Sequence, residues 1–360
     1  MRIRRVLIAA HLLLLLTSAR AAAAPAATAR AQDDGVEALV NLGVEHEQAG
    51  RFQEALELYL QALGRRPAAE GIYTFVGNAQ FGLGRFEQAL ASYRRAARHN
   101  PEDAGARYGA GNALYNLRRF ADAAAEYEQT ARLRPDLPDP LANLSSAYYN
   151  LDRYPEAITA ALRAVRVKPD FAGGYVNLSW YYSMTDQHRE SLEAARRAVE
   201  LEPSGQMAHT NMCRAHNDLG QYALAVSACE RALRLKPDDG ETLYYLGIAQ
   251  KGLKRPAAAT FARALSALEA AEGPEVDFTY LLGAAYSQLE RHADAIAAYR
   301  RAIAERPSFV KARYNLAVSY VLTGDRASAL AEHRALLALA PEKAARLASL
   351  LDGGPPARRR

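Results

Sequence analysis

Apolar and small residues recur along most of the chain with the spacing of helical faces. Leu39, Leu42, Gly43 and His46 lie at positions i, i+3, i+4 and i+7, and the same spacing returns from Ala55 onward. Residues at this spacing share one face of an α-helix. The pattern therefore predicts two amphipathic helices in close succession.

The two-helix pattern repeats along the chain at one fixed interval, as three independent series show. One series is of prolines: Pro67, Pro101, Pro135, Pro169, Pro203, Pro237, Pro307 and Pro341. A second is of small residues: Gly43, Gly77, Gly111, Ser145, Ser179, Cys213, Gly247, Gly283 and Ala317. A third is also of small residues: Ala55, Ala89, Ala123, Ala157, Ser191, Ala225, Ala295 and Ala329. All three slip by two positions in the same interval, so the period is a property of the whole chain.

Punctuating residues divide each period into two helices. Gly50, Gly84, Gly220 and Gly324 stand between the two apolar patterns, where a chain leaving a helix can adopt positive φ. The proline then ends the second helix because it lacks a backbone donor. Small residues on facing helices allow close packing, and an aromatic side chain fills the space beside them. These aromatics are Tyr59, Tyr93, Tyr127 and Tyr299.

This arrangement resembles the tetratricopeptide repeat, whose signature has aromatic, small and proline residues at fixed offsets. The best-preserved copy reads Tyr73, Val76, Gly77, Gln80, Ala89, Tyr93 and Pro101. The resemblance implies an all-α fold, a right-handed superhelical solenoid of about nine helix-turn-helix repeats. It also implies a non-catalytic scaffold that binds proteins. The repeats are expected at 36–69, 70–103, 104–137, 138–171, 172–205, 206–239, 240–275, 276–309 and 310–343.

The seventh copy departs from the pattern. Pro256 falls near the turn between its helices, Phe261 is displaced, and Glu272, Gly273 and Pro274 replace the usual exit. We therefore expect this copy to be the bend or weak point of the array.

The C-terminal residues predict a cap on the last repeat. Residues 342–352 are apolar on one side, through Ala345, Leu347, Leu350 and Leu351. This pattern predicts a capping helix there. A disordered basic tail is expected at 353–360.

The segment 1–31 has the build of a secretory signal peptide. A cationic start, Met1–Arg5, precedes the apolar stretch Val6–Leu16, and two Ala-Arg-Ala triplets follow, the later one at Ala29–Ala31. This order predicts a periplasmic or extracellular protein. An uncleaved anchor is the alternative, although the apolar stretch is short for a bilayer. Beyond it, no uninterrupted apolar run reaches the roughly 18 residues of a membrane span, so no integral membrane segment is expected in the mature chain.

The charge of the chain argues against nucleic acid as a partner. The formal net charge is +5, from 45 basic and 40 acidic residues. The segment 1–31 holds five arginines and no acid, so the remainder has 45 − 5 = 40 bases against 40 acids. A neutral chain has little to displace counterions from a phosphate backbone.

Motifs for catalysis, cofactors and metals are incomplete in this sequence. Gly109 and Gly111 begin a dinucleotide turn that lacks its third glycine, and Leu253 stands where a phosphate loop needs lysine. Solenoids of this kind expose a binding surface rather than a closed pocket. We therefore expect no enzyme and no cofactor.

Asparagines recur beside the small series and predict a binding ladder. They are Asn41, Asn143, Asn177, Asn211 and Asn315. Their register places them outside the core, on the face that such arrays, by resemblance, turn to the inside of the superhelix. An asparagine amide donates and accepts, so a ladder of them can pair with the peptide groups of an extended chain. The ladder resembles that of O-linked N-acetylglucosamine transferases; the alternative is that asparagine merely tolerates an exposed helix face.

Aromatic residues share this predicted face. Trp180 lies at i+3 from Asn177, with Met184 at i+7, and a groove tryptophan is typical of a binding hot spot. The other members of the strip are Tyr108, Asn112, Asn116, Tyr149, Tyr244, Tyr280 and Tyr314. The tyrosines are as compatible with filling between repeats.

The hypothesis is a largely uncharged groove that binds an extended polypeptide. The alternatives are a carbohydrate ligand, and assembly of an envelope complex through the outer face. The carboxylate clamp of chaperone-binding relatives is incomplete, because Tyr108, Gly173 and Asn177 stand where that family has lysine or arginine.

The two cysteines, Cys213 and Cys229, lie at equal distances in sequence before and after Gln221, at a predicted turn. In an antiparallel hairpin this places them at the same height, which favours a disulfide in an oxidising compartment. A zinc site with His209 and His216, or two free thiols, are the alternatives.

Overall fold

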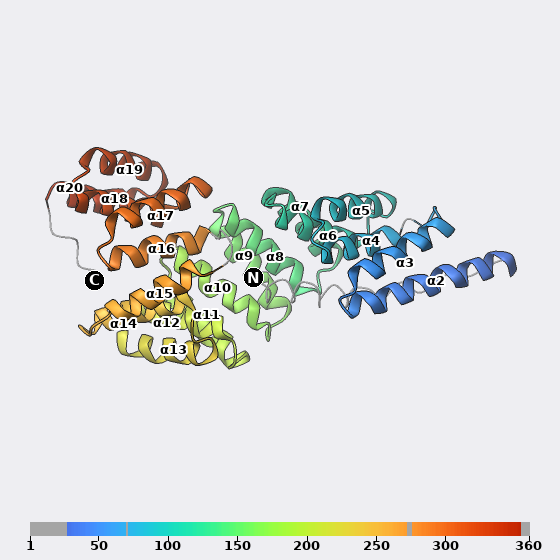
Figure 1. The fold of residues 1–360 in the computed structure, drawn as a ribbon, viewed down its shortest axis with the longest axis horizontal. Coiled ribbons are helices and arrows are strands. Elements are labelled where there is room, and N and C mark those ends of the chain that lie inside the picture. Colours follow the sequence, from blue (N-terminus) through green and yellow to red (C-terminus); the bar gives the residue numbers. More distant parts are fainter. Residues whose placement is uncertain (1–26, 70, 272–275, 354–360) are drawn as a thin grey trace. The chain divides into compact units, whose positions relative to one another are not determined.

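The computed structural model describes residues 27–69, 71–271 and 276–353. Within these ranges the chain forms nineteen helices and no strand (Figure 1), so the predicted all-α solenoid is confirmed. None of these helices is both long and apolar enough to cross a membrane. The predicted signal peptide lies outside the described residues as far as residue 26, and so does the predicted tail from residue 354.

The helices follow one another with only short turns between them. In chain order they are α2 (Ala27–Gln48), α3 (Phe52–Arg65), α4 (Ile72–Gly82), α5 (Phe86–His99), α6 (Ala104–Asn116), α7 (Phe120–Leu133), α8 (Pro138–Asn150), α9 (Tyr154–Val167), α10 (Ala172–Met184), α11 (His188–Leu201), α12 (Gln206–Asp218), α13 (Tyr222–Leu235), α14 (Gly240–Gly252), α15 (Ala258–Glu269), α16 (Val276–Gln288), α17 (His292–Glu305), α18 (Val310–Thr323), α19 (Arg326–Leu339) and α20 (Pro341–Leu351).

The chain divides into two compact units. Unit 1 ends at Asn177 and unit 2 begins at Leu178, within α10. Inside each unit, helices adjacent in sequence pack together, and even-numbered helices also approach each other, such as α4 and α6 in unit 1 and α12 and α14 in unit 2. Odd-numbered helices do not approach each other as closely within the described residues. We call the even-numbered helices, which form the closer row, the inner helices, and the odd-numbered ones the outer helices.

A glycine on the inner helix and a tyrosine on the outer helix form the packing unit of several repeats. The Tyr127 side chain is 1% exposed, and a Cβ atom at Gly111 would lie 2.7 Å from its ring. No side chain fits there without displacing the tyrosine, which explains the small series in the sequence. The same contact occurs in the pairs Gly43–Tyr59, Gly77–Tyr93 and Gly283–Tyr299.

Three consecutive repeats replace the glycine–tyrosine pair with two residues of intermediate size. All six side chains in these positions are fully buried. A larger inner residue is matched by a smaller outer one, so the space between the helices stays filled. The pairs are Ser145 with Ala161, Ser179 with Ala195, and Cys213 with Cys229.

The turn between the two helices of each repeat contains one left-handed residue. Gly50, Gly84, Gly220 and Gly324 have φ between 70° and 82°, which confirms the prediction for these glycines. Residues with side chains hold the same conformation in the other repeats: Arg118, Asp152, Asp186, Lys254 and Glu290. A left-handed residue with a Cβ atom is strained by roughly 1–2 kcal/mol, so the turn geometry outweighs local preference at these five positions.

The turn between the two helices of the seventh repeat is longer than the corresponding turn of the other repeats. Pro256 lies between α14 and α15, and α15 has 12 residues where the other outer helices have 14. The ring of Phe261 packs where a Cβ atom at Gly247 would lie, at 2.6 Å. The aromatic contact of the other repeats is therefore kept, although Phe261 stands one helical turn earlier in its helix.

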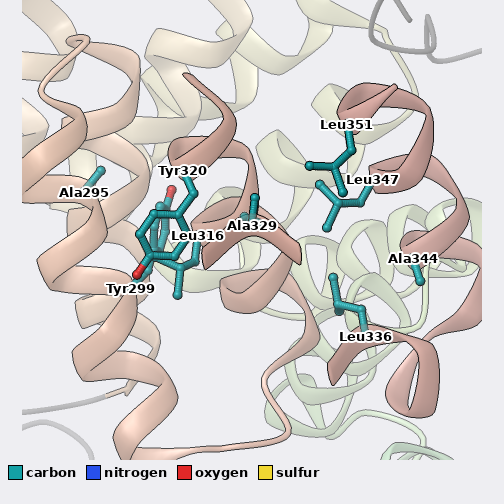
Figure 2. Close-up of a cluster of buried hydrophobic side chains, with 10 residues drawn as sticks. Ala295, Tyr299, Leu316, Tyr320, Ala329, Leu336, Ala344, Leu347 and Leu351 are labelled. Carbon is teal, nitrogen blue, oxygen red and sulfur yellow. The ribbon is translucent and has the colours of Figure 1, made fainter. Parts of the chain in front are cut away.

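Helix α20 covers the apolar side of the last repeat (Figure 2). It begins at Pro341, which is favourable in the first turn because the missing N–H has no partner there. Ala344 and Leu347 are fully buried, and Leu351 is 7% exposed. Ala345, expected on the buried side, is exposed instead. The buried cluster joins these residues to Ala295, Tyr299, Leu316, Ala317, Tyr320, Ala329 and Leu336.

Candidate functional site

Two of the predicted ladder asparagines connect adjacent repeats. The Asn143 side-chain amide donates to the Tyr108 hydroxyl at 2.9 Å and to Asn112 Oδ1 at 3.0 Å. The Asn315 amide likewise donates to the Tyr280 hydroxyl at 3.1 Å. Each asparagine thus bonds a tyrosine of the preceding repeat. These amide donors are already used between inner helices, which the ladder hypothesis did not foresee.

Asn112 belongs to the core rather than to an open groove. Its side chain is 2% exposed, and its Oδ1 accepts from the Tyr127 hydroxyl at 2.8 Å. Burial raises the pKa of Tyr127 well above its ordinary value, so the hydroxyl keeps its proton. In the preceding repeat, Asn78 accepts from the Tyr93 hydroxyl at 2.9 Å. The tyrosine that fills each of these two repeats therefore also satisfies an inner-helix asparagine.

The other residues of the predicted binding surface differ in burial: some are buried in the core and others are exposed to solvent. Asn211 is 4% exposed, so the prediction that the ladder lies outside the core is wrong for this residue. The physical reason is that each inner helix packs against the next, which covers this face. Tyr108 and Tyr149 are also buried, at 3% and 7%. By contrast, Asn41 is exposed; the partly exposed positions are Asn116, Asn143, Asn177, Trp180, Met184, Tyr244, Tyr280, Tyr314 and Asn315.

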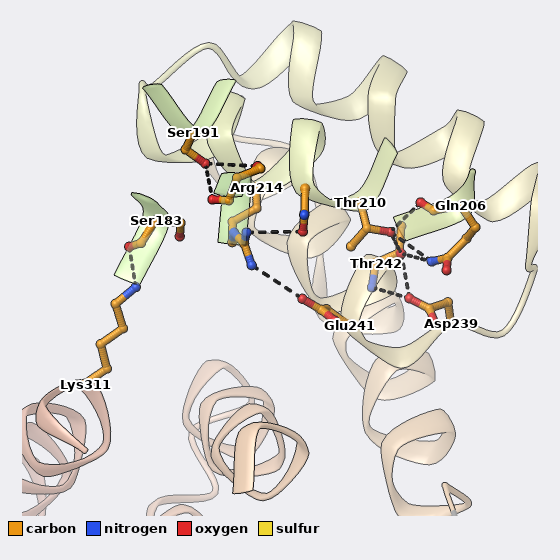
Figure 3. Close-up of polar contacts among 11 residues, drawn as sticks. Ser183, Ser191, Gln206, Thr210, Arg214, Asp239, Glu241, Thr242 and Lys311 are labelled. Carbon is orange, nitrogen blue, oxygen red and sulfur yellow. Dashed lines mark hydrogen bonds and ion pairs between the residues drawn. The ribbon is translucent and has the colours of Figure 1, made fainter. Parts of the chain in front are cut away.

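The inner helices of unit 2 gather charged residues that the sequence analysis did not select (Figure 3). Arg214 of α12 is 2% exposed, and its guanidinium lies 4.2 Å from the centre of the Trp180 ring. Its Nη2 donates to Asn211 Oδ1 at 3.2 Å, and its Nη1 lies 3.8 Å from Glu241 Oε1. Lys311 of α18 donates from Nζ to the Ser183 carbonyl oxygen at 3.0 Å. We call Trp180, Ser183, Arg214, Glu241 and Lys311 the inner cluster.

The charges of the inner cluster act on one another. Burial is the largest influence on Lys311 and lowers its pKa to about 8. Arg214 and Lys343 lower it further, whereas Asp218 and Asp186 oppose them. A lysine with this pKa is still mostly protonated at neutral pH. Two cations, Arg214 and Lys311, thus lie on the inner helices of unit 2, where the sequence predicted a largely uncharged groove.

One signal for the inner cluster was present in the sequence. Arg214 stands three periods after Asn112 and one period after Trp180. A basic residue at a position that holds asparagine in two earlier repeats is unusual within this array. Only the spatial neighbours, however, show that Lys311 belongs to the same place, since it comes from α18, three inner helices further along the chain.

The two cysteines face each other across the sixth repeat. Cys213 of α12 and Cys229 of α13 are joined by a disulfide, with 5.2 Å between their Cα atoms. The histidines of the zinc alternative have other contacts: His209 Nε2 pairs with the Pro203 carbonyl at 2.9 Å, and His216 Nδ1 with Gln221 Oε1 at 2.7 Å. Among the described residues, no three His, Cys, Asp or Glu side chains are grouped to hold a metal ion.

Solved structures share the fold of this chain. A tetratricopeptide repeat protein from Parabacteroides merdae matches with 16% identity and a TM-score of 0.57, covering 70% of this chain and 99% of its own. PilF of Pseudomonas aeruginosa matches with 15% identity and a TM-score of 0.53, covering 59% of this chain and 96% of its own. The Cut9–Hcn1 hetero-tetramer of APC/C matches with 15% identity and a TM-score of 0.50, over 88% and 76%. Identities this low establish the fold alone.

Sequence profiles identify the repeats directly. Tetratricopeptide repeat profiles match residues 16–70, 77–138, 138–171 and 181–240, and a TPR repeat profile matches residues 278–324. A comparison with curated proteins gives no match. The matched segments together span most of the chain. The chain belongs to the tetratricopeptide repeat family.

Proposed function

We propose that this protein is a non-catalytic scaffold that binds an extended polypeptide along the inner helices of unit 2. Tetratricopeptide repeats serve generally as protein-interaction scaffolds, and the family is typically non-catalytic. The finer proposal, a polypeptide on the inner helices, depends on which polar groups the fold leaves available. An extended polypeptide presents alternating hydrogen-bond donors and acceptors. Its recognition therefore requires polar side chains that are not already hydrogen-bonded within the fold.

The observation that carries the proposal is the state of Arg214. Its Nε and Nη1 atoms have no hydrogen-bond partner within the described residues, although the side chain is 2% exposed. Arginine stacked on tryptophan is a pair typical of interface hot spots, because both side chains offer large contact areas with directed polar groups. In unit 1 the equivalent inner position is satisfied by a tyrosine hydroxyl. We therefore expect the ligand to bind to the inner helices of unit 2 rather than to those of unit 1.

A peptide array and a glycan array, probed with the same labelled protein, test the class of ligand. We expect retention on peptides, and a Trp180→Ala variant should lose about tenfold or more in affinity for the selected peptides. Leu224→Ala is the matched control, since Leu224 is 53% exposed on the outer helix α13. Retention on glycans alone would replace this proposal with the carbohydrate-binding alternative. Equal losses in both variants would contradict the inner-helix location.

We also propose a periplasmic or extracellular location. The N-terminal residues have the order of a secretory signal peptide, and a disulfide between Cys213 and Cys229 persists in an oxidising compartment. Thiol labelling of the protein, denatured without reduction directly from fractionated cells, tests this location. We expect the protein in the secreted or periplasmic fraction with no reactive thiol. Two reactive thiols in a cytosolic fraction would contradict it.

A further inference from the structure

Three hydrogen-bond donors from three inner helices of unit 2 lack acceptors of the kind they favour. Arg214 of α12 has Nε and Nη1 without a hydrogen-bond partner, and the fully buried Ser183 hydroxyl of α10 is in the same state within the described residues. Lys311 of α18 donates only to the Ser183 carbonyl oxygen and contacts no carboxylate among those residues. Figure 3 shows Lys311 extending toward Ser183, and Arg214 on the neighbouring helix.

Unpaired donors of this kind are costly. A buried charged group without its hydrogen bonds loses the solvation that water provided, and nearly all buried polar groups in proteins are paired. The acceptors on the neighbouring helices do not remove the cost, because the Glu241 carboxylate lies 3.8 Å from Arg214 Nη1, beyond hydrogen-bonding distance. An acceptor group of a bound ligand would supply the missing hydrogen bonds.

The geometry of the donors indicates which acceptor fits. A guanidinium offers parallel N–H groups in one plane, which match the two oxygens of a carboxylate. The Trp180 ring, 4.2 Å from the guanidinium carbon, supports this plane from one side. Lys311 supplies a point charge from across the cluster. We propose that Arg214, Lys311 and Ser183 together bind one carboxylate group of the bound polypeptide, an inference that rests on the proposed function.

The carboxylates around the inner cluster contact side chains other than Lys311. Lys343 is paired with Asp186 at 3.0 Å, and His188 faces Asp218 at 3.7 Å. The carboxylate nearest to Arg214 is that of Glu241, at 3.8 Å, whereas Lys311 donates only to the Ser183 carbonyl oxygen. Lys311 is thus a cation without a carboxylate partner among the described residues, and a ligand carboxylate would be its first.

Protonation provides an independent signature of this binding. Burial, Arg214 and Lys343 hold the pKa of Lys311 near 8, against Asp218 and Asp186. A carboxylate beside the amine would raise that pKa, because an opposite charge favours the protonated form. Binding above pH 8 should therefore take up a proton, and affinity should fall as pH rises further. Titration calorimetry at pH 8.5 in buffers of different ionisation enthalpy measures this uptake.

A set of matched peptides tests the ligand. Trp180 is the single tryptophan of the chain and touches Arg214, so its fluorescence reports binding directly. The probe is a nine-residue peptide of alanine, serine and glycine with one central glutamate, acetylated and amidated so that this carboxylate is its only charge. A second peptide has glutamine instead, and a third is the glutamine peptide with a free C-terminal carboxylate. We expect about tenfold tighter binding than that of the second, neutral peptide when a carboxylate is present. Comparison of the first and third peptides shows whether a side chain or a C-terminus supplies it.

Two lysine variants separate the site from the general charge of the unit. Lys311→Met keeps the aliphatic stem and should abolish both the preference for carboxylate and the proton uptake. Lys343→Met removes a cation that is already paired with Asp186 and should leave the preference within about twofold. Arg214→Lys retains the charge without the planar fork and should weaken the preference. Thermal melts followed by Trp180 fluorescence show that each variant is folded.

The outcomes distinguish this inference from the proposed function. If array-selected peptides bind but neither carboxylate probe binds more tightly than the neutral glutamine probe, the carboxylate site is wrong and the scaffold function stands. An unchanged preference in Lys311→Met would also overturn the site. If neither the arrays nor the probes show any binding, the polypeptide-binding function itself fails.

Discussion

Asn112 in unit 1 and Arg214 in unit 2 occupy the same position of the repeat, three periods apart, yet their surroundings differ. Asn112 accepts a hydrogen bond from Tyr127 of the neighbouring outer helix at 2.8 Å. The residue that corresponds to Tyr127 in the sixth repeat is Cys229, which is bonded to Cys213. No hydroxyl reaches Arg214 from that position. The outer helix therefore decides whether the inner polar group has a hydrogen-bond partner within its own repeat.

The difference shows how one repeat can serve two purposes. A glycine–tyrosine pair fills the space between the helices and delivers a hydroxyl to the inner face. A cysteine pair or a serine–alanine pair fills the space without delivering one. In the three repeats with a serine–alanine or cysteine–cysteine pair, the inner position holds Ser146, Trp180 or Arg214. In these repeats the buried pair supplies no hydroxyl to the inner residue.

The largest effect is expected from exchanging these buried pairs. Tyr127→Ala should destabilise unit 1 by about 3–5 kcal/mol, because it leaves a cavity and an unsatisfied Asn112. Gly111→Ser should cost about 1–3 kcal/mol, since a Cβ atom there meets the tyrosine ring at 2.7 Å. The double variant recreates the natural Ser145–Ala161 pair and should be more stable than Tyr127→Ala alone. Urea unfolding followed by circular dichroism measures all three; strictly additive losses would refute the compensation.

Opposite signs are expected when the two equivalent polar residues are removed. Asn112→Ala should destabilise by about 1–3 kcal/mol, because the Tyr127 hydroxyl loses its acceptor in the core. Arg214→Met should be neutral or stabilise by about 1–2 kcal/mol, because it removes a buried cation with incomplete hydrogen bonding and keeps the volume. Chemical denaturation of both variants checks the prediction. A large loss in Arg214→Met would mean that this side chain is structural after all.

The two units should respond to pH in different ranges. In unit 1, burial raises the pKa of Glu47 to about 7, with the Tyr59 hydroxyl donating to it at 2.9 Å. The stability linked to Glu47 is present below its ordinary pKa of 4.5 and is lost as pH rises through 7. The depressed pKa of Lys311 acts at higher pH: its contribution is present above 10.5 and is lost as pH falls through 8.

Each pH effect has its own readout. Hydrogen exchange of the α2 and α3 amides should show unit 1 becoming less protected between pH 4.5 and 7, after correction for the intrinsic rate. Trp180 fluorescence melts should show unit 2 gaining stability between pH 8 and 10.5. Glu47→Gln and Lys311→Met should each flatten only the profile of their own unit. A Glu47→Gln profile parallel to that of the unsubstituted chain would exclude Glu47 as the cause.

The smallest effect should be found at the left-handed turns. Arg118 has φ 60° and Glu290 has φ 61°, so replacing either with glycine should stabilise its unit by about 0.5–1 kcal/mol through relief of strain. Gly84→Ala is the reverse control at the equivalent turn, where φ is 73°, and should destabilise by about 1 kcal/mol. Thermal melts rank the three variants. Destabilisation by both glycine variants would show that their side chains contribute more than the strain costs.

The period made the fold predictable, whereas the site required contacts between distant repeats. The buried glycine–tyrosine pairs and the glycine turns follow from residues close in sequence, so local spacing was sufficient for them. The spacing within one helix predicts the direction in which the Asn211 side chain points. It does not predict that the next inner helix covers that side chain. The sequence does not single out Arg214 for a related reason, because a surface arginine and a buried one are identical in sequence.

The sequence by itself determined the helical hairpin, its repetition and the small-to-large matching inside each repeat, because these depend only on the helical spacing and on the period. Only the tertiary structure decided which polar side chains form hydrogen bonds with neighbouring helices. Hydrogen bonds such as Asn143 to Tyr108, and the approach of Lys311 to the distant Ser183, depend on how successive hairpins rotate against one another. That rotation is set by the summed packing of many side chains, and no single spacing encodes it.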